Sequence, residues 1–80
     1  MKLPRDVDSR QLIKALAKLG YRITRQNGSH IRLTCGAPTP HSLTVPDHHP
    51  IKPGALNGIL ATVSAHHRID KTELIGRLFD

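Results

Sequence analysis

The sequence predicts an α+β fold in two layers: a helix, a three-stranded antiparallel sheet and a second helix, followed by a short extra helix at the C-terminus. Apolar residues recur at helical spacing in three segments, one near the start and two over the last third of the chain. Between positions 21 and 45 they alternate with polar residues instead, as in strands that are buried on one face. Helices must cover that apolar face, so the opposite face of the sheet stays open.

Length and charge describe one small basic domain over residues 1–80. Eighty residues leave no room for a second core, and 12 Lys+Arg against 6 Asp+Glu give a net charge of +6. This charge favours a polyanionic or acidic partner, although a solvated basic surface with no nucleic-acid role explains it equally well. One Cys cannot form an internal disulfide, and the sequence contains no signal peptide or membrane span, so the expected location is the cytoplasm.

The first helix is expected to start near Ser9 and to end at Gly20. Asp8 is a good N-cap residue, and Gln11 three positions later completes a capping box. Gly20 can adopt the left-handed conformation that ends a helix. The apolar line of this helix comprises Leu12, Ile13, Leu16 and Leu19.

A β-hairpin is expected to turn around Asn27 and Gly28. A two-residue Asn-Gly loop would mix polar and apolar residues on both faces, so we predict a three-residue loop over 26–28 with Gly28 left-handed. This register pairs Ile23 with Ile31, Tyr21 with Leu33, and Thr24 with His30. The open face then carries Arg22, Thr24, His30 and Arg32. The residues expected to be buried against the helices are Ile23, Ile31, Leu33, Leu43 and Val45.

The remaining elements are a short third strand and two helices. Leu43 and Val45 alternate with polar neighbours in a strand that ends at Pro46. Pro53 fits the first position of a helix whose apolar line comprises Leu56, Ile59, Leu60 and Val63. Asp70 caps the last, short helix, whose buried line comprises Leu74, Ile75, Leu78 and Phe79.

Three short motifs stand at the ends of these elements: Gly28-Ser29-His30 at the hairpin turn, Leu43-Thr44-Val45-Pro46 with His48, and Lys52-Pro53-Gly54-Ala55-Leu56 at the start of the second helix. Together with the opening helix they resemble the HicA-type toxins of type II toxin–antitoxin modules over nearly the whole chain. The resemblance implies a double-stranded-RNA-binding-like α-β-β-β-α fold and mRNA cleavage by one catalytic histidine, without a metal or another cofactor. It also implies a cognate HicB-type antitoxin protein as partner. It assigns the histidine to His30 and the turn residues to Gly28 and Ser29.

His30 is a candidate catalytic residue from its position as well. Alternation places it on the open polar face, where RNA can reach it. RNA cleavage without a metal needs a base for the 2′-hydroxyl proton, an acid for the leaving 5′-oxygen, and cations for the charge on the phosphate. Imidazole titrates near neutral pH and can serve as the base or as the acid. The second proton carrier stays open among Ser29, the charged side chains and water. An exposed histidine with no role is the alternative.

The expected RNA contacts are cations and one helix start. Arg22, Arg32 and Lys52 are hypothetical phosphate contacts, and the free backbone N–H groups near Gly54 form a second candidate for holding a phosphate. An ordinary proline-started helix is the alternative at that position. The rival function is a non-catalytic RNA-binding module of the same fold, and cleavage of RNA distinguishes the two.

The other histidines and the cysteine predict no metal site or nucleophile. His48–His49 and His66–His67 are adjacent pairs, whose side chains point in different directions rather than toward one ion. His48 either contacts substrate or is solvated in its loop, and the second pair is expected to interact with the dipole where the second helix ends. Cys35 is expected to fill a strand end.

Overall fold

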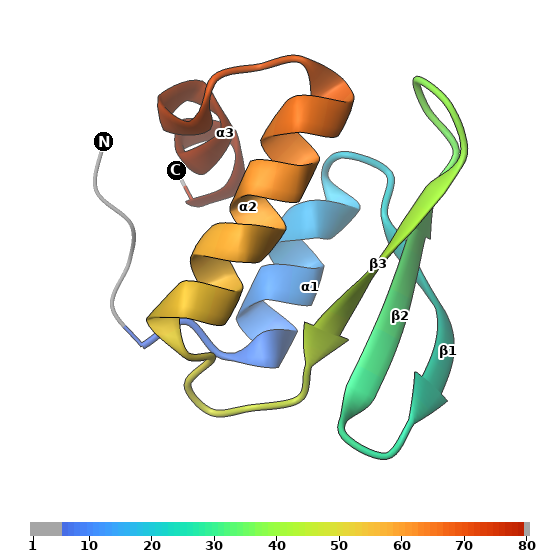
Figure 1. Ribbon diagram of the computed structural model, residues 1–80, viewed down its shortest axis with the longest axis vertical. Coiled ribbons are helices and arrows are strands. Elements are labelled where there is room, and N and C mark those ends of the chain that lie inside the picture. The colour runs from blue at the N-terminus through green and yellow to red at the C-terminus, as the bar shows by residue number, and fades with distance from the viewer. Residues whose placement is uncertain (1–5, 80) are drawn as a thin grey trace.

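The computed structural model describes residues 6–79 and has the element order that the sequence predicts (Figure 1). Helix α1 spans Ser9–Ala17, and strands β1, β2 and β3 span Arg22–Asn27, His30–Cys35 and His41–Pro46. Helices α2 and α3 span Pro53–His67 and Lys71–Phe79. Positions 1–5 and 80 of the expected domain lie outside the described residues. Within the described part of the chain, no helix is both long and apolar enough to span a bilayer.

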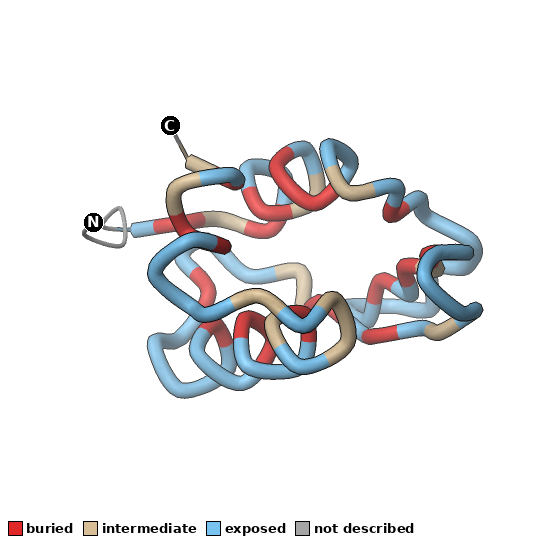
Figure 2. The backbone as a smooth tube through the Cα atoms, turned by 90° about the horizontal axis from the view of Figure 1, so that it is seen from above, coloured by how far each residue is buried: buried red, intermediate tan, exposed pale blue. Residues whose placement is uncertain are grey.

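The strands form one antiparallel sheet in the order β1-β2-β3, and the helices lie on one of its faces (Figure 1). Helix α1 contacts β1 and β3, and α2 contacts β3, whereas α3 packs on the two other helices. The buried residues of the helices and strands face the space between the layers (Figure 2). The predicted two-layer α+β fold with an extra C-terminal helix is therefore confirmed, and the outer face of the sheet is open.

Local sequence determines the helix starts as expected. The Asp8 side chain accepts a hydrogen bond from the backbone N–H of Gln11 at 2.7 Å, and the Asp70 side chain accepts one from the N–H of Glu73 at 3.1 Å. Helix α1 ends at Ala17, with Lys18 as its C-cap, three residues before the predicted end at Gly20, whose φ is +94°. The core contains apolar residues from all the elements except β1, and its fully buried members include Leu12, Leu16, Leu33, Val45, Leu60, Leu74 and Leu78.

The predicted register of the hairpin is wrong. The loop has two residues, Gly28 and Ser29, and Gly28 has a φ of +61° at the first loop position, as in a type II′ turn. The observed pairs are Asn27 with His30, Gln26 with Ile31, Arg25 with Arg32, Ile23 with Leu33, and Arg22 with Thr34. A β-bulge between Ile23 and Arg25 shifts the register by one residue. The predicted register assumed a regular first strand without a bulge. The two-residue loop that was rejected, Asn27-Gly28, begins one position before the loop that the structure has.

The expectation that Ile23 is buried is also wrong, because its side chain is 52% exposed. Its pairing with Leu33 places it on the helix side, but β1 is an edge strand and all six of its residues are exposed. The other residues expected on this face are buried: Ile31, Leu33, Leu43 and Val45.

Truncation of these two isoleucines is expected to have unequal effects on stability. Ile31→Ala removes a side chain that is 5% exposed, which costs about 2–5 kcal/mol in the free energy of unfolding. Ile23→Ala truncates a half-exposed side chain and is expected to cost about 1 kcal/mol or less. Urea denaturation of both variants measures the difference. Equal losses would contradict the edge position of Ile23.

Candidate active site

The hairpin end of the sheet carries the candidate catalytic residue. His30 is the first residue of β2 and lies between Asn27 of β1 and Pro46 of β3. It is exposed on the open face, as predicted. Among the described residues, the hydrogen bonds made by histidine side chains involve His41, His66 and His67, not His30. Its imidazole nitrogens are therefore available to a substrate.

Two arginines lie next to His30 on the open face. Arg32 is two residues further along β2 and so points to the same side, and Arg25 of β1 lies directly opposite Arg32. Both are exposed. Two like charges in a directly opposed pair repel each other, so this pair favours an anion on the open face. Sequence reasoning missed Arg25, because without the bulge strict alternation places it on the helix side.

Arg22 is not part of this cationic pair. It pairs with Thr34, four residues along β2 from His30, which is about 13 Å of strand. Hydroxyl groups occupy the face beside it: Thr24 Oγ1 lies 3.0 Å from Thr34 Oγ1, which lies 2.9 Å from Ser42 Oγ. Arg22 therefore lies apart from the group formed by His30, Arg25 and Arg32.

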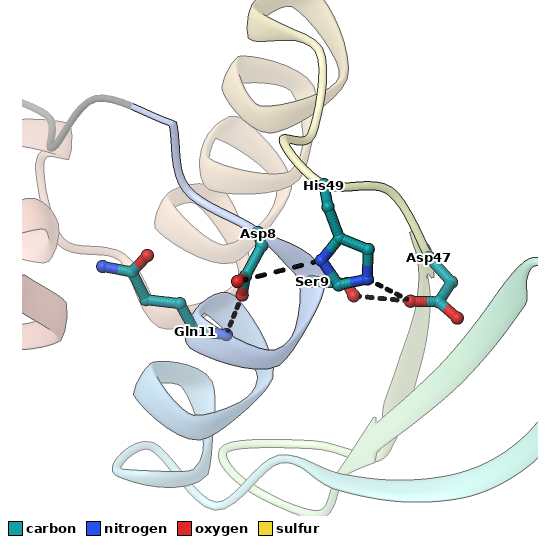
Figure 3. Close-up of polar contacts among 5 residues, drawn as sticks. All are labelled: Asp8, Ser9, Gln11, Asp47 and His49. Atoms are coloured by element: carbon teal, nitrogen blue, oxygen red, sulfur yellow. Dashed lines mark hydrogen bonds and ion pairs between the residues drawn. The ribbon is translucent and has the colours of Figure 1, made fainter.

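The loop between β3 and α2 anchors the hairpin turn to α1. The backbone N–H of Asp47 donates to the carbonyl of Ser29 at 2.7 Å. The Oγ of Ser9, which is fully buried, donates to Asp47 Oδ1 at 2.7 Å (Figure 3). The N–H of Ser9 also donates to the carbonyl of His48 at 3.2 Å. The residues that precede His30 are thus fixed relative to the first helix. Ser9 gave no sequence signal, because its partner lies 38 residues away.

His49 lies between two carboxylates at the same end. Its Nδ1 is 3.8 Å from Asp8 Oδ2 and its Nε2 is 3.5 Å from Asp47 Oδ1 (Figure 3). The ring is more than half exposed, so these contacts contribute little to stability. The neighbouring His48 is exposed in its loop.

The start of α2 belongs to this end of the molecule as well. Lys52 and Gly54 are exposed, and Pro53 is the first residue of the helix, as predicted. A Cβ at Gly54 would meet nothing within 4 Å, so packing does not require glycine there. In Figure 1 the start of α2 and the β1–β2 turn lie at the same end of the molecule, joined by the anchoring loop. The structure thus groups Gly28, Ser29, His30 and Arg32 at the hairpin end and separates Arg22 from them. Lys52 and Gly54 lie at the other end of the anchoring loop, in the helix layer.

A second polar cluster lies at the opposite end of the sheet, where β3 begins and α2 ends. The Tyr21 hydroxyl is 2.5 Å from His41 Nε2 and 3.1 Å from His67 Nε2. Burial raises the pKa of Tyr21 to about 12. Burial and the neighbouring imidazoles of His66 and His67 lower the pKa of His41. Burial and the imidazole of His66 lower the pKa of His67. Sequence reasoning considered His66 and His67 only as an adjacent pair and missed His41, which the fold brings to them.

The lowered histidine pKa values predict a loss of stability in mild acid. In the unfolded chain the imidazoles of His41 and His67 bind protons below pH about 6.5, whereas in the native state they bind protons only at lower pH. The free energy of unfolding should therefore fall as the pH drops below that value. Thermal unfolding in EDTA between about pH 7.5 and 5 measures this, and the His67→Gln variant should lose less. An equal loss in that variant would contradict the assignment.

Cys35 is buried and fills the end of β2, as expected. Its Sγ lies 3.3 Å from the carbonyl oxygen of Leu19 and 3.1 Å from that of Ala37. The thiol donates to these main-chain groups inside the core and is inaccessible as a nucleophile.

The fold and the hairpin end define a small basic α+β domain whose open sheet face presents an imidazole beside two guanidinium groups. A family model described as the HicA toxin of bacterial toxin–antitoxin systems matches residues 9–71. The chain belongs to the HicA toxin family of ribonucleases and is the toxin of a bacterial toxin–antitoxin system, which implies an antitoxin partner. Searches among curated proteins and among solved structures found no match. The matched residues include all three sequence motifs, so the predicted family is confirmed.

Proposed function

We propose that this toxin is a metal-independent endoribonuclease that cleaves mRNA with His30 as its only catalytic histidine. The exposed His30 imidazole, which lies on the open face beside Arg25 and Arg32, carries this proposal. The turn that holds it contains the Gly28-Ser29-His30 motif on which the resemblance to the family rests.

In this reaction the 2′-oxygen of a ribose bonds to the neighbouring phosphorus, and the bond from phosphorus to the 5′-oxygen breaks. A base takes the proton of the 2′-hydroxyl, and an acid gives a proton to the 5′-oxygen, leaving a 2′,3′-cyclic phosphate and a 5′-hydroxyl. His30 serves as the base or the acid, and Arg25 and Arg32 hold the phosphate and its developing charge. The other proton is exchanged with Ser29, a charged side chain or water.

The positions of the potential metal ligands support a cleavage reaction without a metal. The positions of the other cationic groups suggest the path of the RNA. Within residues 6–79, the one group of three potential metal ligands whose ligand atoms all lie within 4.8 Å of one another consists of His41, His66 and His67. His41 pairs with Cys35, so this group is about 17 Å along β2 from His30. Lys52 and the start of α2 at Gly54, which follow the loop that contacts the turn, offer further phosphate contacts, and Arg22 offers another along the sheet.

We further infer that the antitoxin is a HicB-type protein that covers His30 and that the toxin acts in the cytoplasm, where mRNA is found. The net charge of +6 and the cationic open face favour an acidic surface on that partner. An antitoxin bound there blocks the access of RNA to His30.

The purified toxin, freed of antitoxin, is expected to cleave mRNA in the presence of EDTA and to leave 2′,3′-cyclic phosphate and 5′-hydroxyl ends. Gel analysis with end-group labelling detects these products, and addition of the antitoxin should stop their formation. Folded toxin that binds several RNAs without cleaving them would favour the non-catalytic binding module. Cleavage that requires an added divalent metal would contradict the mechanism.

A further inference from the structure

We propose that His41, His66 and His67 form a binding site for a divalent transition-metal ion and that Zn²⁺ fits it best. The three rings come from two elements that meet at the end of the sheet far from His30. His41 is the first residue of β3, and the other two end α2. The site is thus separate from the RNA-cleaving end of the molecule.

The three side chains are close enough to bind a single ion. Their potential ligand nitrogens all lie within 4.8 Å of one another. Nitrogens bound to a tetrahedral Zn²⁺ at about 2.0–2.1 Å are about 3.3 Å apart, so the rings need to approach by at most about 1.5 Å. All three residues are partly exposed, which leaves their rings room to rotate. The rings of His41 and His66 already stack with centroids 3.7 Å apart.

Oxygen atoms around the cluster contact Nε2 of each ring. His66 Nε2 lies 3.0 Å from the carbonyl oxygen of Thr39, which can only accept, so this nitrogen carries the hydrogen and Nδ1 has the free lone pair. The Tyr21 oxygen contacts Nε2 of both His41 and His67 and can accept a hydrogen bond from each. Metal-binding histidines are typically oriented in this way by oxygen atoms outside the ligand set.

The chemistry of the ligands selects the ion. Three neutral imidazoles without a carboxylate suit Zn²⁺, Ni²⁺ or Cu²⁺ and disfavour Mg²⁺ and Ca²⁺, which prefer oxygen. The cluster borders an open cleft lined also by Pro38, Thr39, Ala65 and Arg68. A water molecule or an anion from this cleft can complete the tetrahedron, and Arg68 is the charged side chain that lines it.

An ion at this position joins the sheet to the helix layer. It connects the start of β3 to the end of α2, two positions that are 26 residues apart in the sequence. An ion that binds the native state and not the unfolded chain raises stability by mass action. The expected role of the site is therefore to stabilise the toxin rather than to take part in RNA cleavage.

Titration of the untagged, EDTA-treated toxin with ZnCl₂ tests the proposal. Calorimetry near pH 7.5 is expected to show one ion per chain, and saturating Zn²⁺ is expected to raise the Tm by on the order of 10 °C. Co²⁺ should give the visible absorption bands of a tetrahedral site. His67→Gln and His66→Gln should each weaken Zn²⁺ binding by at least about tenfold and clearly reduce the shift in Tm.

The double variant His48→Gln/His49→Gln is the matched control, because it removes an adjacent histidine pair outside the cluster. It should bind Zn²⁺ as the wild type does. No binding of Zn²⁺ by the wild type, or an equal loss in the control and the cluster variants, would overturn the proposal. His67→Gln should also cleave RNA in EDTA at the rate of the wild type, so the metal site and the catalytic mechanism can fail separately.

Discussion

Replacement of His30 by alanine is expected to reduce RNA cleavage by about 10²-fold or more and to leave RNA affinity nearly unchanged. A general acid or base contributes about 10²–10⁴ to the rate by moving a proton in the transition state, and it contributes little to the binding of the ground state. His30 is exposed and makes no hydrogen bond with another described side chain, so its loss should not affect the core. Single-turnover cleavage in EDTA measures the rate, and filter binding measures the affinity.

His49→Ala provides the matched control for this substitution. His49 is an exposed histidine at the same end of the molecule, but it lies between Asp8 and Asp47 rather than on the open face. Its removal is expected to change cleavage by only a fewfold. If His30→Ala cleaves RNA as fast as the wild type, His30 is not the catalyst. If both variants lose activity equally, the loss reflects a disturbance of the hairpin end rather than the chemistry of one residue.

Most of the fold could be predicted because local signals and apolar periodicity agree. The capping residues Asp8 and Asp70 mark two helix starts, and Pro53 marks the third. The register of the hairpin could not be predicted, since it depends on a bulge after Ile23 that has no marker in the sequence. The alternation of β2 and β3 is regular, and there the predicted faces are correct.

The residues of the candidate site could be predicted only where they lie on a single strand. His30 and Arg32 lie on the same face of β2, and alternation places them there regardless of how β1 pairs. Arg25 reaches that face only because of the bulge. The contact of Ser9 with Asp47 and the approach of His41 to His66 depend on tertiary packing between distant segments, which a pattern of period two or 3.6 does not contain.

The double variant Arg25→Glu/Arg32→Glu is expected to weaken RNA binding by at least about tenfold and to lower the slope of log affinity against log salt. Each lost phosphate contact removes about 0.7 from that slope on single-stranded RNA, so two contacts remove about 1.4. The two guanidinium groups lie opposite each other on the open face, and replacing them also reverses the charge next to His30. Binding titrations at several salt concentrations measure both quantities.

Lys14→Glu/Lys71→Glu is the control for net charge, because it also lowers the charge from +6 to +2. Both lysines are exposed on helices, Lys14 on α1 and Lys71 on α3, and these helices lie on the other side of the sheet from the open face. If RNA binds at the open face, this control should lose much less affinity and keep most of the salt slope, since long-range attraction between exposed charges is screened beyond about 10 Å at moderate salt. Equal losses in the two double variants would show that RNA responds to overall charge alone, and the assignment of Arg25 and Arg32 as phosphate contacts would then be wrong.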